Sequence, residues 1–185
     1  MRACAAVPDV DELQAHFETL PAVAFTVGIV HGDFHAENLF AADHSRDVLM
    51  IDYGSILRNA PVVADAACLE VSLYFAPGHA SVPGVDTCPP ERWRRAVCTY
   101  PLDVAGVPDV TGNTAGWLPN AVREIRAQAE TIDPNPASYA PAVSAYLVRF
   151  AAYDNAPLAD RALAYELACR LVSAVALDLT NEHLA

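Results

Sequence analysis

Two short apolar runs with strand character, separated by a polar segment, constrain the fold of this chain more than any other feature. Residues 23–30 and residues 48–53 are rich in β-branched, aliphatic and aromatic side chains and have the length of a strand. Between them, residues 39–40 can form a very short strand, and the polar residues 43–47 are typical of a turn. The sequence therefore predicts a small hairpin, preceded by a loop that begins at Gly32.

The rest of the sequence has helical periodicity. Asp9 or Asp11 can cap a first helix that ends at Pro21. After Pro61 we expect helices at residues 62–75, 90–100, 119–130, 137–153 and 159–179. We expect the last of these to be the central packing helix, and the stretches 77–90 and 101–119, rich in Gly and Pro, to be surface loops. The predicted fold class is α+β, mainly α, in a single domain over residues 1–185.

Composition excludes several classes of protein. The chain is 54% hydrophobic and 18% charged, which is typical of a globular domain. All eleven basic residues are arginine, and the net charge of -12 disfavours nucleic-acid binding, which needs a basic surface. Five cysteines without a C-x-x-C pair favour a reduced, cytoplasmic chain. The sequence shows no signal-peptide core, and charges interrupt its C-terminal apolar stretch, so we expect no membrane segment.

Two polar motifs lie between and after the predicted strands. The first is His-Gly-Asp-Phe-His-Ala-Glu-Asn at residues 31–38, in which Asp33 and Asn38 are five positions apart. The second is Ile-Asp-Tyr-Gly at residues 51–54, and its Asp52 follows Asn38 by fourteen positions. Magnesium-dependent phosphoryl transfer needs a carboxylate to orient the attacking hydroxyl, together with hard oxygen ligands for the metal. These residue types and spacings fit that requirement.

Together the two motifs resemble those of the aminoglycoside phosphotransferase and choline kinase superfamily, which has a protein kinase-like fold. The resemblance covers about residues 23–75. It implies that Asp33 is the catalytic base and that Asn38 and Asp52 bind magnesium and, through it, the nucleotide. His31 and His35 would support the loop, and Asp65, in a helix-borne Asp-Ala-Ala-Cys-Leu-Glu segment, would hold that loop through backbone hydrogen bonds.

The same resemblance implies a function. The chain would be the kinase-like C-terminal lobe of a phosphotransferase that uses Mg²⁺ and ATP to phosphorylate a hydroxyl group of a small molecule. The acidic composition favours a cationic acceptor through electrostatic steering. The short hairpin would carry the catalytic loop, and the helical remainder would build the acceptor pocket.

The parts that clamp the nucleotide are not found. Kinases hold ATP with a glycine-rich loop and a strand-borne lysine upstream of the catalytic loop, whereas thirty residues without lysine precede His31. Three explanations stay open: the chain is a fragment of a larger enzyme, a partner chain supplies the N-terminal lobe, or the chain is a catalytically inactive binding or regulatory domain.

A different reading of the first motif is a metal-dependent hydrolase. His31, Asp33 and His35 alternate, and alternate residues of an extended segment share a face and can ligate zinc or iron. This hypothesis leaves Asn38 and Asp52 unexplained. The glycine between His31 and Asp33 also favours a loop over a straight strand.

Overall fold

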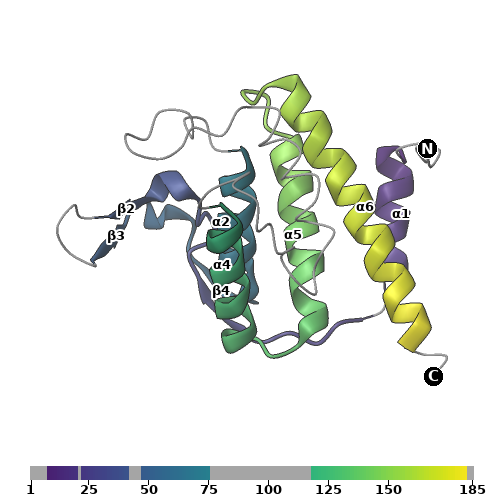
Figure 1. The fold of residues 1–185 in the computed structure, drawn as a ribbon, viewed down its shortest axis with the longest axis horizontal. Coiled ribbons are helices and arrows are strands. Elements are labelled where there is room, and N and C mark those ends of the chain that lie inside the picture. The colour runs from purple at the N-terminus through teal and green to yellow at the C-terminus, as the bar shows by residue number, and fades with distance from the viewer. Residues whose placement is uncertain (1–7, 21, 42–46, 76–117, 183–185) are drawn as a thin grey trace.

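The structure is a computed structural model that describes residues 8–20, 22–41, 47–75 and 118–182. Within these ranges the chain forms five α-helices and two small antiparallel sheets (Figure 1). The predicted α+β, mainly helical class is therefore confirmed. The helix expected at 90–100 and the loop expected at 77–90 lie outside the described residues, as does all but the end of the loop expected at 101–119.

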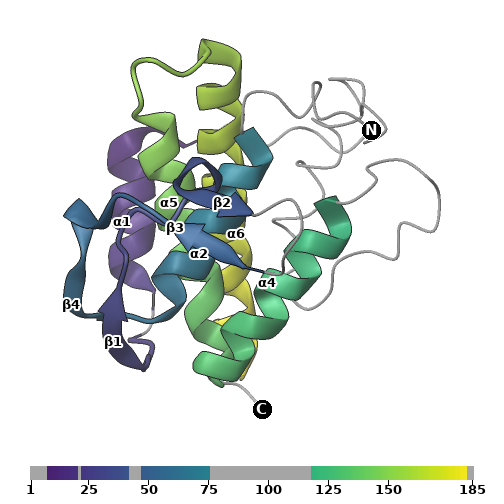
Figure 2. The ribbon, with the colours of Figure 1, turned by 90° about the vertical axis from the view of Figure 1, so that its left-hand side faces the viewer.

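Each of the two sheets has two strands. β1 (Val27–Val30) pairs with β4 (Leu57–Pro61), and β2 (Leu39–Ala41) pairs with β3 (Val48–Met50), which is the predicted hairpin. This hairpin projects from the helices on the side opposite α1 and α6 (Figure 1), and Figure 2 shows it in front of them. β2 and β3 lie between β1 and β4 in the chain. The first motif is therefore in the segment that connects β1 to β2, and the second is in the segment that connects β3 to β4.

The strands differ from the prediction in two respects. Strands were expected at 23–30 and 48–53, but β1 and β3 cover only the later part of the first run and the earlier part of the second. β4 was not predicted at all. Its sequence, Leu-Arg-Asn-Ala-Pro, contains little that favours a strand, and Asn59 has a positive φ of 56°. We infer that β4 owes its extended form to its pairing with β1.

The described helices after β4 match the predicted residue ranges closely. They are α2 (Val63–Phe75), α4 (Leu118–Ile132), α5 (Pro136–Ala151) and α6 (Leu158–Glu182). The amide N–H of Ala137 donates to the side chain of Asn135, which caps α5. None of the helices, within the residues that the structure describes, has the length and apolar character needed to cross a membrane.

The hydrophobic core lies among these four helices and is centred on α5. Figure 1 shows α5 between α2 and α6, and α5 packs against both. Its Leu147 is fully buried together with Leu167 and Leu171 of α6. The expectation that the last helix is the central one was therefore wrong: α6 has α5 on one side and α1 (Val10–Thr19) on another.

The first helix is anchored at both its start and its middle. Asp9 and Glu12 form a reciprocal capping box, in which each side chain accepts a hydrogen bond from the other residue's backbone N–H, at 2.9 and 3.0 Å. Leu13 is buried against Cys169 and Val172 of α6. Of the two caps considered from the sequence, Asp9 is the one in the structure.

A buried charge joins three helices. Glu70 of α2 is fully buried, and its carboxylate accepts two hydrogen bonds from Arg126 of α4, at 2.7 and 3.0 Å. Tyr139 of α5 donates to the same carboxylate at 2.8 Å, and Tyr74 donates at 2.5 Å. Burial lowers the pKa of Arg126, but the hydrogen bonds and the charge of Glu70 outweigh it and raise that pKa. The network fixes α2 relative to α4 and α5.

A second buried carboxylate ties the segment before β1 to the helices. Asp133, between α4 and α5, accepts hydrogen bonds from the backbone N–H of Thr26 at 3.2 Å and from that of Asn135 at 3.2 Å. Burial raises the pKa of Asp133, but these donors outweigh it, so the pKa lies below its usual value. The contact fixes the position from which β1 leads into residues 31–38.

Candidate functional site

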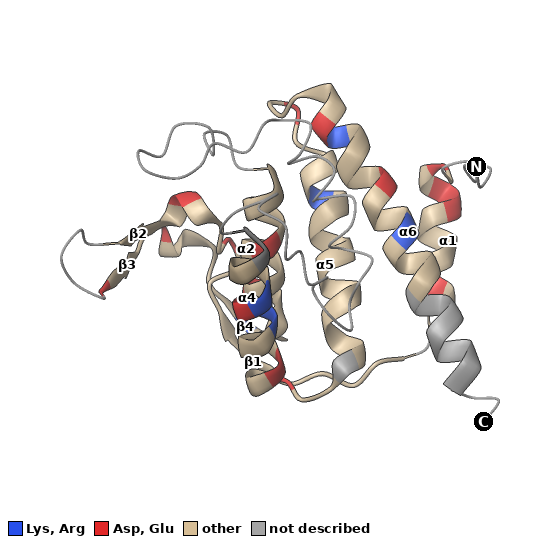
Figure 3. Ribbon diagram, in the orientation of Figure 1, with Lys and Arg blue, Asp and Glu red and all other residues tan. Residues whose placement is uncertain are grey.

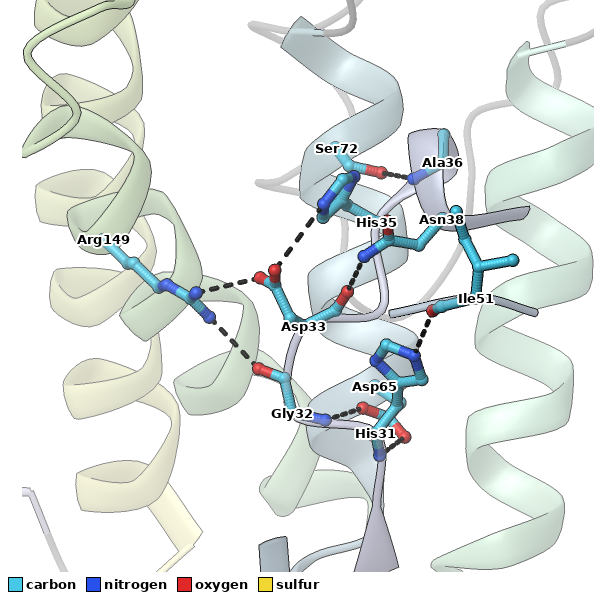
Figure 4. Close-up of polar contacts among 10 residues, drawn as sticks. All are labelled: His31, Gly32, Asp33, His35, Ala36, Asn38, Ile51, Asp65, Ser72 and Arg149. Atoms are coloured by element: carbon cyan, nitrogen blue, oxygen red, sulfur yellow. Dashed lines mark hydrogen bonds and ion pairs between the residues drawn. The ribbon is translucent and has the colours of Figure 1, made fainter. Parts of the chain in front are cut away.

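The loop at residues 31–38 is held by a carboxylate of α2. Asp65, in the first turn of that helix, accepts hydrogen bonds from the backbone N–H of His31 at 2.7 Å and from that of Gly32 at 3.0 Å. Figure 4 shows both contacts at the start of the loop. This is the type of contact that the resemblance implies for Asp65, because it fixes the backbone immediately before Asp33.

Gly32 is required where it stands. Its φ is +80°, a conformation that side chains rarely adopt, and a Cβ added to it would lie 2.2 Å from the carbonyl oxygen of Ser55. Ser55 belongs to the short helical turn η2 (Tyr53–Ser55), which follows directly after Asp52. The glycine of the first motif therefore lets Ser55, the residue directly after the second motif, lie close to the loop.

His31 joins the two motifs. Its Nε2 lies 2.8 Å from the carbonyl oxygen of Ile51, and because a carbonyl oxygen can only accept, Nε2 carries the proton. The imidazole packs against Phe34 and Tyr53, with ring centroids 5.8 and 5.3 Å away, and its buried Nδ1 has no hydrogen-bond partner among the residues that the structure describes. With one nitrogen donating to Ile51 and the ring buried, His31 is placed to support the loop.

Asn38 makes a second connection between the motifs. The side-chain NH₂ of Asn38 donates to the backbone carbonyl oxygen of Asp33 at 2.9 Å. The backbone carbonyl oxygen of Asn38 accepts from the backbone N–H of Ile51 at 3.0 Å. Asn38 ends the short helical turn η1 (Ala36–Asn38) and is buried. Because the amide nitrogen is used by Asp33, the side-chain oxygen is the atom of Asn38 that is left for a cation.

Asp52 follows the residue that His31 and Asn38 both contact. It adopts the left-handed conformation, with φ 60° and ψ 59°, which aspartate tolerates better than most residues. It directly follows Ile51, so the hydrogen bonds of Ile51 fix the point at which the Asp52 backbone leaves the sheet. The structure thus connects the loop carrying Asp33 and Asn38 to the backbone that precedes Asp52.

Asp33 has an unexpected partner. Its Oδ1 forms an ion pair with Nη2 of Arg149 in α5 at 2.9 Å, and Nη1 of Arg149 donates to the carbonyl oxygen of Gly32 at 3.3 Å (Figure 4). On its other side, Asp33 Oδ2 lies 3.6 Å from Nε2 of His35. His35, expected to support the loop, is therefore directed toward the carboxylate of Asp33.

Sequence reasoning missed Arg149 and Ser72. Ser72 of α2 accepts a hydrogen bond from the backbone N–H of Ala36 at 3.0 Å and so holds η1 against the helix. One feature of the sequence marks Arg149: it is the only charged residue of α5. No comparable signal marked Ser72, because a serine on an amphipathic helix is ordinary.

The residues offer donors that suit magnesium. Mg²⁺ prefers oxygen ligands and is commonly held by one or two protein groups, with phosphate and water oxygens completing its shell. Asn38 and Asp52 provide an amide and a carboxylate oxygen, which fits this pattern. Within the described residues there is no group of three or more His, Cys, Asp or Glu side chains placed to hold a metal ion.

The hydrolase reading finds less support in this geometry. Figure 4 shows the ring of His31 directed toward Ile51, whereas His35 is directed toward Asp33. The alternating triplet therefore does not present His31 and His35 to one shared point. The glycine between His31 and Asp33 turns the chain, as its positive φ shows.

The thiol close to Asp33 is not a nucleophile at neutral pH. Burial raises the pKa of Cys68 to about 12, and the nearby Arg149 cation offsets this only in part. Burial likewise raises the pKa of the Tyr146 hydroxyl to about 12. Both groups stay protonated at neutral pH, so neither adds a negative charge to this part of the site.

No family model, curated protein or solved structure matches this chain.

Proposed function

We propose that this chain is the catalytic and metal-binding part of an ATP- and magnesium-dependent phosphotransferase of the aminoglycoside phosphotransferase type. One observation carries the proposal: two hydrogen bonds join the loop that bears Asp33 to the residue before Asp52. His31 Nε2 donates to the carbonyl oxygen of Ile51, and the backbone N–H of Ile51 donates to the backbone carbonyl of Asn38. If Asp33, Asn38 and Asp52 only capped separate turns, the two motifs would not need to be joined by these hydrogen bonds.

Each residue has a distinct part in the proposed reaction. Asp33 orients the hydroxyl of the acceptor and takes its proton as the acceptor oxygen bonds to the γ-phosphorus of ATP, while the bond from that phosphorus to the β,γ-bridging oxygen breaks and ADP leaves. Asn38 and Asp52 hold the metal through oxygen atoms. When bound, magnesium would neutralise part of the negative charge of the phosphates. Asp65 and His31 keep the loop in place without touching the reacting atoms.

The apolar surface of the strands is where we propose that a nucleotide-clamping lobe is seated. Ile29 of β1 is 70% exposed and Leu49 of β3 is 63% exposed. Phe40 and Val48 of the same hairpin are also exposed. A two-stranded hairpin of this size is marginal by itself, and contiguous exposed apolar side chains commonly mark an interface. The lobe would come from the same polypeptide or from a partner chain.

The test uses binding first and turnover second. We expect Mg·ATP to raise the Tm of the chain, and we expect Asp52→Asn to reduce that shift. Asp11→Asn, which removes the same charge from the exposed face of α1, is the control. An identical shift in the Asp52 variant would exclude Asp52 as a ligand.

Turnover is measured with any upstream coding sequence restored, using ATP and a panel of hydroxylated acceptors. Asp33→Asn is expected to lower kcat about 10²–10⁴-fold, as loss of a general base does. Activity untouched by this change would remove Asp33 from the role of base.

A second candidate function is a kinase-like binding module without turnover. The observation that favours it is the ion pair of Asp33 with Arg149, because one of the two carboxylate oxygens is already bonded to a cation. This candidate predicts binding of Mg·ATP with no phosphate transfer to any acceptor. Transfer that depends on Asp33 would contradict it.

A further inference from the structure

Among the residues that the structure describes, Arg149 is the arginine that contacts the proposed base. It is the only charged residue of α5, and its side chain is 42% exposed although it contacts both Asp33 and Gly32. In Figure 3, where Lys and Arg are blue, one blue segment lies on α5. The side chain of Arg149 is therefore partly accessible beside Asp33, the proposed base for the acceptor hydroxyl.

Two tyrosines hold the guanidinium in place. The Cζ of Arg149 lies 5.7 Å from the ring centroid of Tyr146 and 5.9 Å from that of Tyr153, within the range of cation–π attraction. Burial lowers the pKa of Arg149, but the neighbouring Tyr153 and Asp33 raise it, so the group is always charged. An arginine held by its neighbours loses less freedom when it binds a ligand.

The guanidinium has more donors than its known partners use. Arginine carries five N–H bonds in a planar fork, and within the described part of the chain two acceptors are bonded to it, Asp33 Oδ1 and the Gly32 carbonyl. An arginine can bridge two anionic groups, because its fork offers donors on two edges. The group can thus keep Asp33 oriented while it binds an anion of a ligand.

The same geometry argues against a cationic acceptor. An ammonium group next to the reacting hydroxyl would meet the positive charge of Arg149, and the carboxylate that could attract it, Asp33, is already paired. The overall negative charge of the chain acts at long range and is screened by salt, whereas Arg149 acts at contact distance.

From these contacts we propose that Arg149 is the specificity residue for an acceptor that carries an anionic oxygen group, a carboxylate or a phosphate, close to the hydroxyl that is phosphorylated. This inference rests on the proposed function and names its acceptor class. It replaces the cationic acceptor that net charge alone favours.

Binding of simple probes tests this without turnover. The probes are glycerate and glycerol 3-phosphate as hydroxylated anions, glycerol as the neutral analogue and 2-aminoethanol as the cation, at matched ionic strength. Isothermal titration of the whole chain is expected to show binding of at least one anion at millimolar concentration or below, and weaker or no binding of the other two. Arg149→Gln is expected to weaken anion binding about tenfold or more, because a hydrogen bond to a charged group is lost.

Two further variants control for folding and for charge. Arg123→Gln removes an arginine of α4 whose side chain contacts Asn120, and it should leave anion binding unchanged. Arg149→Lys keeps the charge without the fork, so it should retain part of the affinity even if Arg149→Gln folds poorly.

Several results would overturn the proposal. Equal anion binding by the wild type and Arg149→Gln would do so, as would binding of 2-aminoethanol as tight as that of the anions, or no binding of either anion. Inorganic phosphate that binds as tightly as glycerol 3-phosphate while glycerate does not bind would assign Arg149 to the phosphate donor, which also overturns it. Mg·ATP binding by Asp52→Asn is measured in parallel, so a failure of the phosphotransferase proposal is seen separately.

Discussion

The carboxylate of Asp65 and the backbone N–H of Gly32 are 3.0 Å apart, although the two residues are thirty-three positions apart in the sequence. The same carboxylate binds the N–H of His31 at 2.7 Å. One side chain of α2 thus fixes the two residues that precede Asp33. The position of Asp33 is therefore set by a helix of the core and not by the loop alone.

Asp65→Ala should be costly for stability. It leaves two partly buried N–H groups without an acceptor, and because hydrogen bonds to charged groups contribute about 1.5–3 kcal/mol each, we expect a loss of about 3 kcal/mol in the free energy of unfolding. Urea denaturation measures it. The control is Asp154→Ala, at a side chain that is 99% exposed, for which we expect less than about 1 kcal/mol. Equal losses in both variants would show that the Asp65 contact is not formed.

Gly32→Ala should disturb the site as well as the fold. The added Cβ would lie 2.2 Å from the Ser55 carbonyl in a backbone conformation with φ +80°, so the loop must move, at a cost of about 1–3 kcal/mol. Gly54→Ala is the matched control, because its Cβ would meet only Asp52 Oδ1, at 3.4 Å. Chemical denaturation of both variants checks the difference. A Gly32 variant as stable as the Gly54 variant would contradict the close approach of the two motifs.

Much of the fold could be predicted because its helices repeat apolar residues at a fixed spacing. The hairpin β2–β3 was predicted for a similar reason, since its strands are apolar and the residues between them are polar. β4 was not, because Arg58, Asn59 and Pro61 do not favour a strand, and the pairing with β1 that holds them extended is a tertiary contact. The central position of α5 in the core was missed for the same reason, because sequence periodicity does not show which helices a given helix packs against.

The candidate site could be predicted where it depends on local motifs and not where it depends on packing. Asp33, Asn38 and Asp52 stand at recognisable spacings along a short stretch of chain. Arg149 lies 116 positions from Asp33 in the sequence, so no residue near the motif indicates their contact. The contact of Ser72 with Ala36 is a structural role that a motif search does not reveal.

Glu70 and Arg126 should behave as one unit. Removing either partner leaves the other as an unpaired buried charge. Glu70→Ala and Arg126→Ala are therefore each expected to lower the free energy of unfolding by about 3–5 kcal/mol. The double variant should cost less than the sum, because the second change removes a charge that is already unpaired. The control is Glu166→Ala in the exposed pair with Arg170 on α6, for which we expect about 0.5 kcal/mol. Additive losses would show that the two side chains are not coupled.

The stabilising effect of Asp133 should depend on pH. Its pKa is lowered because the N–H groups of Asn135 and Thr26, and the hydroxyl of Ser138, outweigh the effect of burial. A carboxyl whose pKa is lower in the folded state adds stability above its unfolded pKa of about 3.9, and this is lost as the pH falls through the folded value. Asp133→Asn should therefore be less stable than the wild type at neutral pH, and the difference should shrink below about pH 4. Urea unfolding across this range measures the difference, and a gap that stays constant with pH would show that ionised Asp133 is not what holds Thr26 in place.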